Sequence, residues 1–288
     1  MLQPQLNLES LARKLDAGGF NPDDAAESLT LPSVWYYDSE IFELEQQRLF
    51  LRAWVYVGHV TDLNAPGRQL AAHVGDQAVL VIRNDENELQ AFDSADLRPV
   101  RVEVYAGLLF VNFDTDAVPL ASQASQLLEA INRVCPDLAH MKCAHRATRD
   151  VAANWKTIVD NNHECYHCAV NHPDLMAMTD YSARATWSDE GITFVHTLDG
   201  YSEDSAPFTC EHSGTESLYS FIFPTAIPLF FAGTGGLVLF HIRPTGPQTS
   251  QIGHDFYFPD GTSAKAQSEF IDYITQTLAT EDVGWACA

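Results

Sequence analysis

Residues 154–175 read NWKTIVDNNHECYHCAVNHPDL and place three histidines and two cysteines within 22 positions. We predict a helix that begins at Asn154, whose side chain can cap the free amides of the first turn, and that continues past His167. On this helix Asp160, Glu164 and His167 fall at i, i+4 and i+7, which is one stripe. Carboxylates and an imidazole on a largely buried helix are costly unless each is hydrogen-bonded or bound to a metal.

Two of the histidines are candidates for a shared metal site. His172 follows His167 by five residues, which is a poor helical match. Pro173 pushes the residue before it out of the α region, so the helix should end there and let His172 turn back toward His167. A third ligand is needed, and the Glu281–Asp282 pair at the end of the last predicted helix fits. Two histidines and one carboxylate form the facial arrangement of non-haem Fe(II) oxygenases.

A zinc site is the alternative for the same stretch. Its ligands would be Cys165, His167, Cys168 and His172. A structural zinc site normally takes its second ligand pair from a separate segment, and four ligands on one helical turn cannot all point inward. We therefore rank zinc second and expect Cys165 and Cys168 to be small buried hydrophobic residues.

Composition limits the classes of partner. The chain has 288 residues, 46% of them hydrophobic, and 39 acidic against 16 basic residues give a net charge of -23. Such a charge repels phosphate backbones and anionic membranes, so we expect neither a nucleic-acid nor a membrane partner. The N-terminus does not resemble a secretory signal, and no segment approaches a membrane span. Six irregularly spaced cysteines fit a reducing compartment, so we expect a cytoplasmic protein.

Short apolar runs and turn residues divide the chain into three parts. We expect a helical segment at 1–53, a small β-rich region at 54–114 and a larger domain at 115–288. In the first two parts, apolar spacing predicts helices at 6–18 and 38–54 and strands at 54–60, 78–84, 89–92 and on both sides of Gly107.

The third part combines helices with a strand-rich meander. Helices are expected at 118–135, from Asn154 onward and at 263–285, and strands at 219–224, 228–233, 236–244 and 252–259. One face of the last helix carries Phe270, Tyr273, Ile274 and Leu278. A curved antiparallel sheet that grips a long helix is the economical arrangement, so the predicted class is α+β.

These residues carry a family resemblance. NWK, followed by ECYHC and by His172-Pro173, resembles the catalytic iron motif of the Rieske-type ring-hydroxylating oxygenases, large (alpha) subunit. Glu164, three residues before the first histidine, makes the motif most similar to the branch acting on quaternary ammonium compounds, such as glycine betaine and carnitine monooxygenases. The resemblance extends to WYYDSEIFELEQQRLFLRAW at 35–54, to RPVRVEVYAGLLFVNFD at 98–114 and to the ED pair at 281–282.

The resemblance implies roles for individual residues. His167, His172 and Asp282 would be the iron ligands of a helix-grip catalytic domain. Glu164 would be the bridging carboxylate that links the iron to the Rieske [2Fe-2S] cluster of an adjacent subunit in a homotrimer, and Asp160 and Asn161 are further catalytic candidates. Partners would be O2, a small-molecule substrate and a flavin- or ferredoxin-type reductase.

One departure from the family concerns the Rieske cluster. The cluster needs a C-x-H and a C-x-x-H pair, and these ligands are absent from the region at 54–114. Cys143 and Cys210 each begin a C-x-H, but no C-x-x-H follows. The sequence AFDSADLRPV joins the two flanking strands directly, so we expect a chain break or a disordered junction near 93–95. Several tens of residues are missing relative to the family, and the C-terminus is shortened as well. Either this chain closes over disordered or removed segments, or the protein is a natural or engineered one that has lost its electron input.

The expected activity is O2-dependent monooxygenation, with oxidative N-demethylation of a small quaternary or tertiary amine such as a betaine. A trimethylammonium group is best held by aromatic faces. The candidates lie in the meander, and most of them would also pack in the core: Phe221, Phe223, Phe230, Phe231 and Phe240. The alternatives are hydroxylation of an aromatic ring and a redox-inactive binding module with a hydrophobic cavity.

Overall fold

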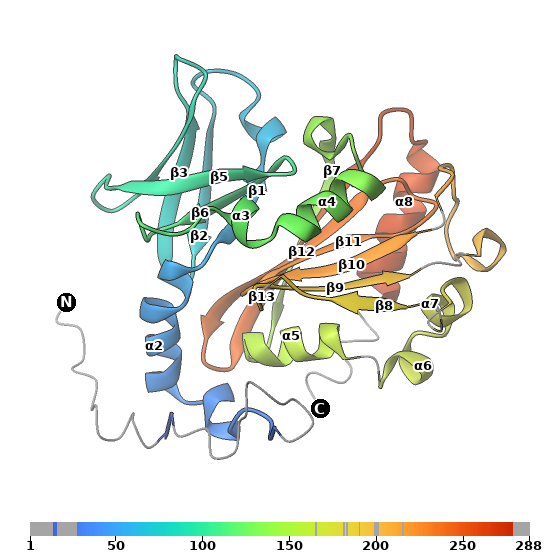
Figure 1. Ribbon diagram of the computed structural model, residues 1–288, viewed down its shortest axis with the longest axis horizontal. Helices are drawn as coiled ribbons and strands as arrows, with labels where there is room; N and C mark the ends of the chain where they lie inside the picture. Colours follow the sequence, from blue (N-terminus) through green and yellow to red (C-terminus); the bar gives the residue numbers. More distant parts are fainter. Residues whose placement is uncertain are drawn as a thin grey trace.

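The structure is a computed structural model that describes residues 14–15, 28–164, 166–180, 182, 184–189, 191–198, 202–214 and 216–278. Two antiparallel sheets with helices around them make up this part of the chain (Figure 1). The predicted α+β class is confirmed. No helix of the described residues is long and apolar enough to cross a membrane. Most of the predicted helix at 6–18 and the 281–282 pair lie outside the described residues, and the boundaries at 53 and 114 remain predictions.

The first sheet has six strands in the order β1-β6-β5-β4-β3-β2. Its strands are β1 Val55–His59, β2 Gln69–Val74, β3 Gln77–Arg83, β4 Leu89–Asp93, β5 Pro99–Tyr105 and β6 Leu108–Asn112. Five of them coincide with predicted strands. β2 was not predicted, because QLAAHV is an edge strand with two alanines and only one β-branched residue, Val74.

The junction between β4 and β5 is a closed hairpin, so the expected chain break is wrong. Ala91 pairs with Val100 and Phe92 with Pro99, and the amide of Asp93 donates to the carbonyl of Arg98 over 2.9 Å. The buried Asp93 carboxylate accepts from the amide of Ala95 and from the guanidinium of Arg98, both over 2.9 Å. Hydrogen bonds within residues 93–98 therefore hold this connection in place.

The second sheet has seven strands in the order β7-β13-β12-β11-β10-β9-β8. The predicted meander is present as β10 Ser217–Ile222, β11 Ala226–Phe230, β12 Leu237–Gly246 and β13 Thr249–Phe258. Sequence patterning missed β7 Lys142–Val151, β8 Ala185–Trp187 and β9 Thr193–Leu198. In β7 half of the side chains are both polar and exposed, so the strand lacks the apolar alternation on which prediction rests.

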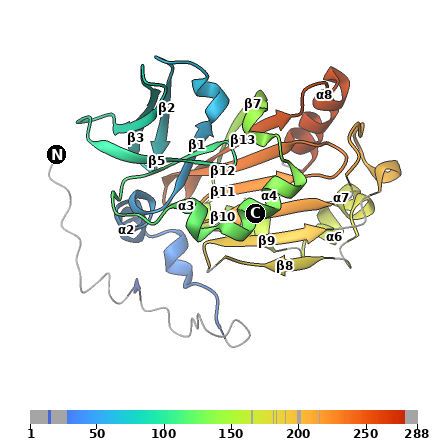
Figure 2. The same cartoon turned by 45° about the horizontal axis from the view of Figure 1, so that its top comes forward.

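Helices cover both faces of the second sheet. In β12, Val238 and Phe240 pack into one core cluster while Leu237 and Leu239 pack into the other, as the two-residue period of a strand requires. Figure 2 shows α4 lying across β10 and β11. The opposite face receives α5 and the final helix. The helices are α2 Ser39–Arg48, α3 Leu120–Gln123, α4 Ser125–Val134, α5 Trp155–His163, α6 Cys168–Asn171, α7 Pro173–Met178 and α8 Ala264–Asp272, which continues as a π-helical segment Tyr273–Leu278.

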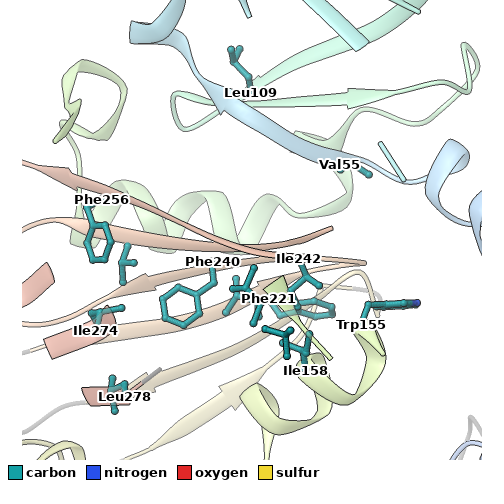
Figure 3. Packing of buried hydrophobic residues seen from close by; sticks show 14 of the residues in the cluster. Val55, Leu109, Trp155, Ile158, Phe221, Phe240, Ile242, Phe256, Ile274 and Leu278 are labelled. Carbon is teal, nitrogen blue, oxygen red and sulfur yellow. The ribbon is translucent and has the colours of Figure 1, made fainter. Parts of the chain in front are cut away.

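The core on the α5 face is aromatic and aliphatic. Figure 3 shows Trp155 and Ile158 of α5 beside Phe221 and Ile242 of the sheet. Phe270, Tyr273, Ile274 and Leu278 are all buried, which confirms the predicted apolar face of the last helix. This packing fixes α5, and with it the start of the segment that carries the histidines.

Polar contacts join the two sheets. The Tyr56 hydroxyl of β1 donates to the carboxylate of Asp255 in β13 over 2.7 Å, and both groups are buried. Nε2 of His59 lies 3.1 Å from the carbonyl oxygen of Leu138. A carbonyl only accepts, so Nε2 carries the proton, and Nδ1 accepts from the amide of Thr61 over 3.2 Å.

Candidate metal centre and its cavity

The helix that carries the site ends earlier than predicted. Asn154 caps α5 by accepting from the amide of Lys156 over 2.9 Å, as expected. However, α5 stops at His163 and Glu164 has an extended backbone, with φ -95° and ψ 151°. The predicted continuous stripe through Asp160 and Glu164 is therefore wrong. The Glu164 carboxylate accepts from the amide of Tyr166 over 2.7 Å, and this local side-chain bond competes with continued helix.

The two histidines meet beyond this break. Nε2 of His167 and Nε2 of His172 lie 3.1 Å apart. His167 precedes the short helix α6, and His172 lies between α6 and α7 with φ -119° and ψ 63°. Pro173 occupies the first position of α7, where its missing N–H costs nothing. The predicted chain reversal before Pro173 thus brings His172 back to His167.

Glu164 holds the first histidine in place. Its Oε1 lies 2.5 Å from Nδ1 of His167. A carboxylate that accepts from Nδ1–H leaves the lone pair on Nε2, which is the nitrogen that faces His172. The side chain of Glu164 is 43% exposed and that of His167 is 15% exposed. The pair therefore lies at the protein surface with its far nitrogen directed inward.

A cavity of about 100 Å³ adjoins the histidine pair. A cavity needs roughly 10–15 Å³ to hold one water, so this cavity can hold a small organic molecule. Its walls are largely apolar. The residues that line it include Leu229, Phe231, Phe240, Arg184 and His196.

The five aromatic candidates divide into two groups. Phe231 and Phe240 line the cavity. Phe221 packs against His163 with ring centroids 4.5 Å apart, Phe223 is 37% exposed, and Phe230 packs in the core cluster on the α4 face. These three do not line the cavity.

The two other candidates from α5 have different surroundings. Asn161 lines the cavity, whereas Asp160 is not among its lining residues. The Asp160 carboxylate accepts from the Tyr36 hydroxyl over 2.8 Å. Burial raises the pKa of Asp160 above its ordinary value, although the Tyr36 hydrogen bond opposes this rise. Asp160 thus connects α5 to the segment before α2.

Sequence patterning did not single out three residues of the cavity, namely His163, Arg184 and His196. Burial lowers the pKa of His163 and of His196 to about 4, and both are therefore neutral near pH 7. Nε2 of His163 is buried and has no hydrogen-bond partner among the described residues. Only His163 lies in the motif, while Arg184 and His196 arrive from distant segments whose spacing gives no signal.

The sulfur chemistry does not support the zinc alternative. Cys168 is buried and disulfide-bonded, so its sulfur is not a free thiolate. This finding corrects the expectation of a reduced cysteine at this position. In the described part of the chain no three His, Cys, Asp or Glu side chains form a cluster that could hold a metal ion. The expected third ligand, Asp282, lies outside it.

Relatives were found by sequence and by structure. Carnitine monooxygenase oxygenase subunit of Acinetobacter baumannii is 24% identical over 91% of this chain and 84% of its own length. Glycine betaine monooxygenase oxygenase subunit of Pseudomonas aeruginosa is 25% identical over 64% of this chain and 58% of its own. The carnitine alignment spans 316 positions, of which this chain fills about 262, so the relative carries about 54 positions that are gaps here.

Solved structures agree with the fold. A quaternary ammonium Rieske monooxygenase, described for carnitine oxidation by gut microbiota, matches with TM-score 0.79 at 21% identity over 90% of this chain and 84% of its own. Naphthalene 1,2-dioxygenase from Rhodococcus sp. matches with TM-score 0.73 at 14% identity over 89% of this chain and 81% of its own. At these identities the likeness shows the fold alone.

The family model for the ring hydroxylating alpha subunit (catalytic domain) matches residues 138–287. This span contains the seven-stranded sheet, the histidine pair and the cavity. The resemblance drawn from the motif is confirmed: the chain belongs to the family of ring-hydroxylating alpha subunits, the Rieske-type non-haem iron oxygenases.

Proposed function

We propose that this chain is the oxygenase component of a monooxygenase that removes an N-methyl group from a small amine bearing a carboxylate. The observation that carries the proposal is the His167–His172 pair, held by Glu164, beside a largely apolar cavity. Among the described residues that line this cavity, the exposed Arg184 is the one arginine or lysine. The names of the carnitine and glycine betaine relatives support the same substrate class.

The residues present fit a mononuclear iron. Two imidazole nitrogens converge at 3.1 Å, and the far nitrogen of one of them is fixed by a carboxylate, which is the usual support for a metal-binding histidine. His167 and His172 would hold the metal, with Asp282 as the proposed third ligand. A bound non-haem iron supplies the activation of O2 that inserts one oxygen atom into a C–H bond.

The cavity suits a zwitterion. Phe231 and Phe240 offer aromatic faces to a trimethylammonium group, and the neutral His163 and His196 add no repelling charge. Arg184 has no acidic partner among the described residues, so its guanidinium is available to a substrate carboxylate. The apolar walls exclude water from the methyl group that reacts.

The test compares substrates on the iron-loaded chain driven by a small-molecule reductant. We expect formaldehyde release and O2 uptake with glycine betaine or carnitine. Ring hydroxylation of benzoate in their place would establish the aromatic alternative. Tight binding of either ligand without any O2 uptake would establish the redox-inactive binding module.

Arg184→Gln tests the proposed carboxylate contact. A hydrogen bond to a charged group contributes about 1.5–3 kcal/mol, so KM for a betaine should rise roughly 10- to 100-fold. KM for choline, which lacks the carboxylate, should stay unchanged in the same variant. An equal rise for both substrates would show that Arg184 supports the cavity wall instead.

A further inference from the structure

The six-stranded sheet contains no cysteine. All six cysteines of the chain lie at position 135 or later, whereas this sheet spans residues 55–112. A Rieske cluster takes two cysteines and two histidines, and no C-x-x-H occurs anywhere in the sequence. Of the two histidines in the sheet, His59 uses both ring nitrogens in hydrogen bonds, with Leu138 and Thr61. The residues present therefore do not fit a Rieske cluster.

The short connection between β4 and β5 is held by hydrogen bonds of its own residues. Asp93 is 2% exposed, and its carboxylate is satisfied by the Arg98 guanidinium and the Ala95 amide. Ser94 also donates to the carbonyl of Ala78 in β3 over 2.9 Å. The buried carboxylate of this short connection thus has matched donors, and the connection contains neither a cysteine nor a histidine that could bind a cluster.

We infer that the iron site of this chain is reduced by a separate iron–sulfur protein, and not by a cluster of this chain or of a second copy. The inference rests on the proposed function, because an oxygenase needs an electron source. One substrate, one O2, two electrons and two protons give the N-hydroxymethyl product and one water. For a quaternary substrate, the N–CH2OH group then breaks its C–N bond to release formaldehyde, the tertiary amine and a proton. The donor supplies the two electrons one at a time.

The surface beside the histidine pair provides a docking face, which we define by Glu164, Tyr166, Val170 and Asp174. Tyr166 is 97% exposed and Val170 is 78% exposed, and they lie on either side of His167 in the sequence. We assign the contact with the partner to these two side chains because both are exposed and they flank His167 in the sequence. Glu164 and Asp174 make this face acidic, in a chain of net charge -23. A carrier with a basic face is therefore the complementary partner.

The first experiment is a composition measurement on the full chain, produced in cells that assemble iron–sulfur clusters. We expect about one iron and no acid-labile sulfide per chain, and no visible cluster absorbance. Two sulfides per chain with a Rieske spectrum would overturn the inference. This measurement does not depend on the substrate, so it is independent of the proposed function.

The second experiment measures electron transfer from a reduced Rieske-type ferredoxin to the oxidised iron-loaded chain, followed anaerobically by the cluster absorbance. The paired variant Tyr166→Lys with Val170→Lys should slow this transfer at least 10-fold, because two added cations repel a carrier with a basic face. Val104→Lys, at an exposed apolar position on β5, is the matched control and should leave the rate unchanged. Iron content should match in all three proteins.

Each contrary result has a separate meaning. An unchanged rate in the paired variant, or equal slowing in the Val104 control, would overturn the docking face. Full reduction by a flavin reductase without any iron–sulfur protein would overturn the class of donor. If reduction by ferredoxin succeeds while no amine is demethylated, the proposed function fails and this inference stands.

Discussion

The polar residues around the two sheets differ in what they contact. Around the seven-stranded sheet, the chain keeps a histidine pair, a carboxylate behind it and neutral histidines in a cavity, none of which an apolar core would need. In the six-stranded sheet, the buried Asp93 closes a turn and the buried His59 contacts Leu138, which lies just before β7. Asp255 of the seven-stranded sheet also makes a connection, to Tyr56, so the difference lies in the histidine pair and the cavity. The proposed iron ligands and the cavity therefore belong to the part of the chain around one sheet, and the other sheet carries no proposed ligand.

Loss of a metal ligand should produce the largest effect. In His172→Ala, iron content should fall from about one per chain to near zero, and O2 uptake should vanish with it, because two of the proposed ligands must act together. His73→Ala, at an exposed position in β2 of the other sheet, should keep full iron content. Iron is measured by mass spectrometry on the purified proteins. Full iron in His172→Ala would place the metal elsewhere.

The buried His59 should make stability depend on pH. Burial lowers its pKa from 6.5 to about 4, so the folded protein keeps it neutral while the unfolded chain binds a proton below pH 6.5. The contribution of neutral His59 to the free energy of unfolding is complete above pH 6.5 and is lost as the pH falls toward 4. The loss is up to about 3 kcal/mol, because each pKa unit corresponds to 1.36 kcal/mol. His163 and His196 act in the same direction.

Urea unfolding at pH 7, 5.5 and 4.5 measures this dependence. His59→Gln should be less stable at pH 7, since it loses contacts to Leu138 and Thr61, but its stability should decline less on acidification. His73→Gln, with an exposed side chain, should follow the parent protein. Parallel curves for all three proteins would mean that His59 does not set the slope.

A charge change at Glu164 should separate iron binding from turnover. In Glu164→Gln, the amide oxygen can still accept from Nδ1–H of His167, so iron should be retained. Changes in such supporting residues typically cost 10- to 100-fold in affinity or activity, and we expect that loss in ferredoxin-driven turnover. Iron content and O2 uptake are measured in the same preparation. Loss of iron as complete as in His167→Ala would make Glu164 a ligand.

Much of this arrangement could be read from local sequence rules. The Asn154 cap, the turn before Pro173 and the strands β10–β13 follow from capping, proline sterics and apolar alternation. The helix break at Glu164 could not, because it depends on a side chain that competes for backbone amides. Arg184 reaches the cavity only through tertiary folding.

The smallest expected effect tests whether the β4–β5 turn only closes the six-stranded sheet. Asp93→Ala removes the acceptor of Ala95 and Arg98, and because Arg98 can turn to water the cost should be about 1 kcal/mol in the free energy of unfolding. Asp85→Ala, in the exposed β3–β4 turn, is the matched control and should cost less than half of this. Iron content should not change in either variant, because the turn belongs to the sheet that carries no proposed ligand. Urea midpoints and iron measurements on the same samples decide the matter. If Asp93→Ala lost its iron while remaining folded, the two sheets would be coupled through this turn, and the separation argued above would be wrong.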